Sequence, residues 1–85
     1  MKTEPSRKIV REFVVSSLVK KREHLEISDQ ENIIISGLLD SLGIIKTITF
    51  LEEKYHFVIK DEDVLPENFE SIEAISSFVD RISNQ

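Results

Sequence analysis

Apolar residues at helical spacing fill three separate stretches of this chain, and this periodicity constrains the fold more than any other feature. Residues three, four and seven positions apart share one face of an α-helix, so each stretch predicts a helix with a core-facing side. An alternative interpretation makes 33–36 (IIIS) a short strand, but no second strand of comparable quality is present to pair with it. The sequence therefore predicts an all-α fold, a small helical bundle of three main helices and one short helix.

The first helix is predicted over about residues 6–21, where Ser6 is a good N-cap and Pro5 is tolerated. The second begins at Asp40 or Ser41. Its core stripe is Ile44, Ile48, Leu51 and Tyr55, whereas Leu42, Ile45 and Thr49 lie on another face and Glu52 and Glu53 face solvent. Asp61 is expected to cap a short helix over Asp61–Leu65 that Pro66 helps to end. Ser71 opens the last helix, with a buried face of Ile72, Ile75, Val79 and Ile82.

A long connection joins the first two helices and has too many apolar residues for a free loop. We expect it to lie across the helices, anchored by Leu25, Ile27, Ile33, Ile34 and Ile35.

Composition limits the class of protein. Eighty-five residues allow one domain, 1–85, with a core of about 6–82. The chain has no cysteine, no apolar run near the roughly 20 residues that span a membrane, and an N-terminus too charged for a signal peptide. We therefore expect a cytoplasmic monomer without membrane insertion.

Charge is unevenly spread along the chain. Residues 1–22 carry seven Lys/Arg and two acids, and residues 23–85 carry four Lys/Arg and fourteen acids. The basic residues of the first helix are read as a solvated face. Lys20, Lys21 and Arg22 could contact a nucleic acid, but the acidic body argues against such a partner.

No catalytic or metal site is predicted. His24 and His56 are far apart in sequence, and Ser41 lacks the G-x-S-x-G elbow of a nucleophile. The acids of DEDVLPENFE lack the spacing and the glycine of a calcium loop.

Ser41, in the stretch GLLDSLG (37–43), has three possible roles: helix cap, catalytic nucleophile or point of covalent attachment. A helix N-terminus offers unpaired N–H groups and a positive dipole end, which favour a phosphodiester on this serine. Asp40 could assist a magnesium-dependent phosphoryl transfer by a partner enzyme. Gly37 lets the chain turn into the helix, and Gly43, unfavourable inside a helix, could leave bare backbone for that enzyme to approach.

GLLDSLG heads an amphipathic helix ending LEEKYHF, and VIKDEDVLPENFESIEAISSFV follows. Together these resemble the acyl carrier protein family, which includes peptidyl carrier (thiolation) domains, over about 6–82 and most specifically over 37–79. The resemblance implies a four-helix bundle with a short third helix and a 4′-phosphopantetheine arm on Ser41. It also implies a carrier that is not itself an enzyme and that shuttles a thioester-bound cargo between partner enzymes. Carried over by position, the partner-binding face comprises Leu42, Ile45, Thr49, Glu52, Glu53, Asp61, Glu62 and Asp63.

Gly43 and Lys46 occupy places where fatty-acid carriers have acids, so the resemblance favours freestanding aminoacyl carriers, such as D-alanyl carriers, over a fatty-acid synthesis carrier. The implied partners are a phosphopantetheinyl transferase, an adenylating ligase, and acyl-transfer or condensing enzymes. Phe50, Tyr55 and Phe57 are bulky and predict a small, closed pocket between the second and third helices, suited to short loads. The alternative from another class is an unmodified helical adaptor that binds a partner through Leu42 and Ile45.

Overall fold

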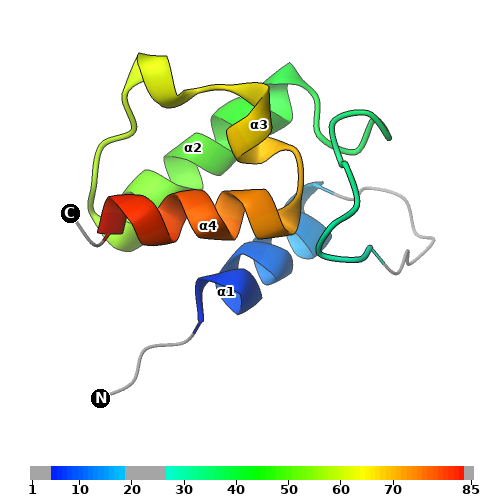
Figure 1. The fold of residues 1–85 in the computed structure, drawn as a ribbon, viewed down its shortest axis with the longest axis horizontal. Coiled ribbons are helices and arrows are strands. Elements are labelled where there is room, and N and C mark those ends of the chain that lie inside the picture. The colour runs from blue at the N-terminus through cyan, green and yellow to red at the C-terminus, as the bar shows by residue number, and fades with distance from the viewer. Residues whose placement is uncertain (1–4, 19–26, 84–85) are drawn as a thin grey trace.

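The computed structural model describes residues 5–18 and 27–83, and every regular element in those ranges is helical. Helix α1 (Ser6–Phe13) continues into a π-helical turn, η1 (Val14–Leu18), and α2 (Ser41–Tyr55) follows the long connection. A 3₁₀ turn, η2 (Asp61–Asp63), and the short α3 (Pro66–Phe69) lead to α4 (Ile72–Ser83), which packs on α1 and α3 (Figure 1). The predicted all-helical bundle with three main helices is confirmed for this part of the chain. The predictions for residues 19–26, which include His24 and Leu25, fall outside the residues that the structure describes.

Three helix starts differ from the prediction. Ser6 is the first residue of α1 and not its cap, because its hydroxyl instead donates to Asp80 Oδ1 at 2.8 Å and ties α1 to α4. Asp61 likewise begins η2 without capping it. Pro66 starts α3 instead of ending a helix, since its fixed φ suits a first helical turn, and its ring disfavours a helical backbone at Leu65, which is extended.

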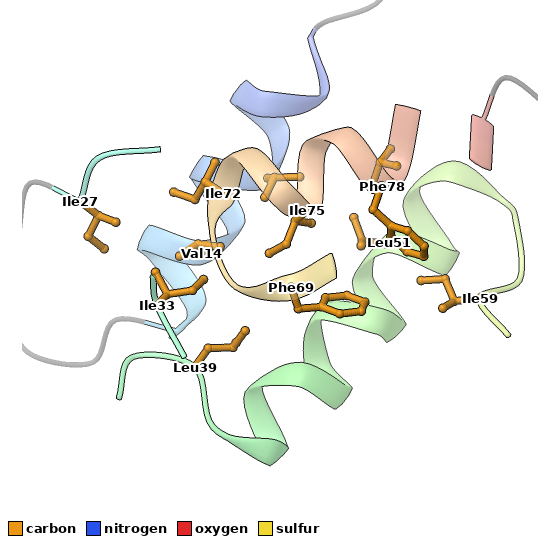
Figure 2. Packing of buried hydrophobic residues seen from close by; sticks show 12 residues of the cluster. Val14, Ile27, Ile33, Leu39, Leu51, Ile59, Phe69, Ile72, Ile75 and Phe78 are labelled. Atoms are coloured by element: carbon orange, nitrogen blue, oxygen red, sulfur yellow. The ribbon is translucent and has the colours of Figure 1, made fainter. Parts of the chain in front are cut away.

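The core joins α1, η1, α2, α3 and α4 around one apolar cluster (Figure 2), to which η2 contributes no buried residue. Ile72, Ile75 and Val79 of α4 are buried as predicted, and Ile82 is half-buried. The predicted stripe of α2 packs on the core: Leu51 is fully buried, and Ile44, Ile48 and Tyr55 are half-buried against the cluster. The prediction missed Gly43 and Thr47, which are also fully buried. The Thr47 hydroxyl can be buried because it donates to the Gly43 carbonyl oxygen at 2.8 Å.

The connection before α2 is tied to the helices, as expected, although by fewer apolar anchors. Ile27 and Ile33 are buried and Ile34 is half-buried, but Ile35 is 82% exposed, so its predicted anchoring role is wrong. Backbone bonds complete the attachment: Ile33 N donates to Glu70 O at 2.7 Å, and Glu73 N donates to Asp29 O at 2.9 Å. The loop is therefore held from the side of α4.

Arg11 holds the same loop from the side of α1. Its guanidinium donates to Asp29 Oδ1, at 3.2 Å from Nε and 2.9 Å from Nη2, and also to the carbonyl oxygen of Ile27. Arg7 adds a looser ion pair, with its Nε 3.6 Å from Asp29 Oδ2. The prediction that the basic residues of α1 form a solvated face is therefore wrong for Arg11, which is a structural clamp between α1 and the loop.

We expect Arg11→Ala to lower the free energy of unfolding by about 1–3 kcal/mol, because two acceptors lose a charged donor. Arg7→Ala is the matched control and should cost less than about 0.5 kcal/mol, since its pair is looser and more exposed. Chemical denaturation of both variants measures this difference, and equal costs would show that Arg11 is no clamp.

Candidate functional site

The start of α2 places Ser41 at the first helical position. Asp40 has an extended backbone, and its Oδ1 accepts a hydrogen bond from Gly43 N at 2.8 Å, so Asp40 is the N-cap. Ser41 is exposed, and its hydroxyl bonds to no other residue in the described ranges. The interpretation of Ser41 as the helix cap is therefore wrong, and its hydroxyl is available to chemistry from outside.

The surroundings of that hydroxyl favour a negatively charged group. The N–H groups of Ser41 and Leu42 precede the first intrahelical bonds and have no acceptor within the described part of the chain. The first turn contains no acid, and the dipole of this 15-residue helix adds positive potential at its N-terminus. Asp40 is the adjacent negative charge, and one of its oxygens is already engaged by Gly43 N.

Gly43 has a different role from the one predicted. It is buried on the core side of α2, its N–H donates to Asp40 Oδ1, and its carbonyl oxygen accepts from the Thr47 hydroxyl. A buried residue cannot offer backbone to an approaching protein. The idea that Gly43 lies on a recognition surface is therefore wrong, and its place in the sequence says nothing about which enzymes the chain serves.

The predicted partner-binding residues divide into exposed and structural ones. Leu42 and Ile45 are 58% and 59% exposed, so they lie off the core as expected. Also exposed are Thr49, Glu53, Asp61 and Glu62, whereas Asp63 is half-buried. Glu52 does not fit the prediction of a solvent-facing acid, because it is half-buried and its Oε2 accepts from Ile59 N at 2.9 Å. Its carboxylate closes the turn after α2.

His56 also serves that turn. It has a left-handed backbone (φ 58°), and its N–H donates to Glu52 O at 2.9 Å, so it ends α2. Its ring is exposed.

No cluster of three metal-ligating side chains occurs in the ranges that the structure describes. Over the same residues, no helix is long and apolar enough to cross a membrane.

The three aromatic residues predicted to fill a pocket face different neighbours. Phe50 stacks on Phe13 of α1, with ring centroids 4.2 Å apart, so it packs toward α1. Tyr55 and Phe57 stack on each other at 5.8 Å, near the far end of α2 from Ser41. Their bulk therefore stabilises two separate contacts, and the size of a pocket between α2 and α3 stays a prediction.

Comparison with models of protein families and with curated protein sequences gives no match for this chain. The assignment of a function therefore depends on the sequence motif and on the geometry around Ser41.

Two substitutions separate the capping role of Asp40 from any role in chemistry. We expect Asp40→Ala to lower the free energy of unfolding by about 1 kcal/mol, because Gly43 N loses its acceptor. Asp40→Asn keeps an acceptor oxygen and should fold with near wild-type stability. If the carboxylate also assists modification of Ser41, Asn will slow that reaction without changing the unfolding transition; an unchanged rate would leave Asp40 a cap alone.

Proposed function

We propose that this chain is a phosphopantetheine-dependent acyl or aminoacyl carrier that holds its cargo as a thioester on an arm attached to Ser41. One observation carries the proposal: the serine of GLLDSLG is the first residue of α2, exposed and without a hydrogen-bond partner in the described ranges, while Asp40 takes the capping role. The carrier itself is not an enzyme.

The residues present suit the attached group. The N–H groups of Ser41 and Leu42 have no acceptor in the described ranges, so they could donate to a phosphodiester on the Ser41 oxygen, in the positive field of the α2 N-terminus. The 4′-phosphopantetheine group supplies the thiol that forms the thioester, and the chain has no cysteine to compete for the cargo.

Attachment requires a phosphopantetheinyl transferase with coenzyme A. The Ser41 oxygen forms a bond to the phosphorus that carries pantetheine, the pyrophosphate bond breaks, and adenosine 3′,5′-bisphosphate leaves. The hydroxyl proton passes to a base of the transferase. Asp40 precedes Ser41 in the chain, and its second carboxylate oxygen, which has no bond in the described ranges, could bind a magnesium ion held by the transferase.

Further partners follow from carrier chemistry. An adenylating ligase loads the thiol, and an acyl-transfer or condensing enzyme takes the cargo. The freestanding aminoacyl subgroup is favoured over carriers of fatty-acid synthesis. Two features support this preference: the sequence motif and Lys46, which is exposed. Gly43 no longer supports it, because this residue is buried.

A second candidate, an unmodified adaptor that binds a partner through Leu42 and Ile45, is favoured by the exposure of both side chains. The two functions differ in their dependence on Ser41, because an adaptor needs no hydroxyl there. Co-expression with a broad-specificity transferase, followed by intact mass spectrometry, distinguishes them: a carrier gains one phosphopantetheine, and an adaptor keeps its unmodified mass.

A further inference from the structure

The segment that carries Ser41 is nearly free of charge. Charged residues make up 32% of the chain, yet the 14 residues from 32 to 45 (NIIISGLLDSLGII) contain only Asp40, which caps α2. Three of the seven large apolar side chains that are exposed in the described ranges, Ile35, Leu42 and Ile45, belong to this segment. An enzyme that covers this segment therefore meets mainly apolar side chains, and Asp40 is the one charge in it that a basic surface could pair with.

Ile35 lies at the tip of a turn that is already ordered. The Asn32 side chain accepts from Ile34 N at 3.0 Å and from Ile35 N at 2.9 Å, and Gly37 N donates to Ile34 O at 3.1 Å. Gly37 takes the left-handed backbone (φ 87°) that the turn requires.

The base of the turn is fixed to the core. Ile33 is fully buried, and its carbonyl oxygen accepts from Leu39 N at 2.9 Å. A side chain presented by a preorganised turn loses little conformational entropy when a partner binds it. Ile35 is 82% exposed, so most of its apolar surface remains to be buried.

The turn lies within reach of any enzyme that covers Ser41. Six residue steps separate Ile35 from Ser41, which sets an upper limit of about 21 Å even for extended chain. A protein–protein interface of ordinary size buries about 800 Å² on each side, a patch about 16 Å in radius. The folded turn is shorter than extended chain, because Leu39 N bonds to Ile33 O. The turn therefore lies at or near the edge of a footprint centred on Ser41.

We propose that Ile35 is an anchor for the phosphopantetheinyl transferase and inserts into an apolar pocket beside the transferase active site. This inference depends on the proposed carrier function and adds to it the chemistry by which the site is recognised. The transferase must place its reacting atoms on the Ser41 oxygen itself, whereas enzymes that handle cargo meet the far end of the arm. The turn next to Ser41 therefore contacts the transferase, whereas the enzymes that handle cargo need not reach it.

Steady-state kinetics with a broad-specificity transferase and coenzyme A test the anchor. We expect Ile35→Ser to lower kcat/KM roughly 10- to 30-fold through a higher KM, the size typical of losing a buried apolar anchor. Ile35→Leu should retain most of the wild-type value. The matched control is Val58→Ser, because Val58 is 77% exposed but follows the far end of α2, a helix about 22 Å long. The Ile35→Ser and Val58→Ser variants should have the same unfolding temperature, because both replaced side chains are exposed.

Salt dependence provides a second readout. Apolar docking predicts a KM that changes little with ionic strength, because salt screens charges and not apolar contacts. Equal kinetics for Ile35→Ser and Val58→Ser, or a KM that rises steeply with salt, would overturn the anchor while leaving Ser41 modification intact. A wild-type chain that the transferase never modifies would instead overturn the carrier function itself, and the anchor with it.

Discussion

Ser41→Ala is expected to remain unmodified under conditions in which the wild-type chain is fully converted to the phosphopantetheinylated form. The effect is all-or-none because the serine oxygen is the atom to which phosphorus becomes attached, and alanine has none. The substitution should leave the fold intact, since Ser41 is exposed, does not cap α2, and has no hydrogen-bond partner in the described ranges. Alanine is also a better helix former than serine, so α2 should not be weakened. Intact mass spectrometry after co-expression measures the outcome.

Ser77→Ala is the control for this experiment. Ser77 is also an exposed serine, but it lies on α4, so its loss should leave the mass gain unchanged. Retention of the mass gain in Ser41→Ala would assign the modification to another residue and contradict the proposed site. Circular dichroism of the three proteins should coincide, which excludes unfolding as the reason for a missing modification.

Much of the fold could be predicted because helical periodicity is a local signal. The start of α2 at Ser41 and the capping role of Ser71, whose Oγ accepts from Ala74 N at 3.0 Å, follow from residue types within one turn. The rotation of α2 could not be read in the same way. Gly43 is fully buried and Ile44 is half-buried against the core, and the packing around α2, which the periodicity does not show, decides which of the two is buried more deeply.

Other errors came from polar side chains with distant partners. Glu52 bonds to a backbone N–H seven residues later, and Arg11 to a loop eighteen residues away. Neither partner has a sequence signal, so both charged residues appeared to be solvated. The exposed Ile35 shows the opposite limit: an isoleucine in an apolar run indicates burial, and only the turn built by Asn32 explains its exposure. At the candidate site, the bond from Gly43 N to Asp40 Oδ1 lies within one helical turn and follows the usual preference for Asp at an N-cap, so it belongs with the predictable features.

Phe69→Ala is expected to have the largest effect on stability, about 3–5 kcal/mol lost from the free energy of unfolding. Phe69 is 1% exposed at the end of α3, and its ring lies 5.5 Å from that of Phe78 of α4 (Figure 2). A four-residue helix has no stability of its own, because nucleation costs more than its few hydrogen bonds return. The position of α3 therefore depends on what this side chain buries, and its removal leaves a cavity that α3 alone cannot close.

Small domains have total stabilities of about 5–15 kcal/mol, so such a loss would leave a substantial unfolded population. Leu65→Ala is the control: it removes an apolar side chain just before α3, but one that is 41% exposed, and should cost less than about 1 kcal/mol. Denaturant titration of both variants gives the comparison. A Phe69→Ala variant as stable as Leu65→Ala would mean that α3 is held by its backbone connections and not by the core. If the expected difference is found, α3 is attached to α4 through Phe69, so changes on the exposed side of α3 can be interpreted as effects on partners.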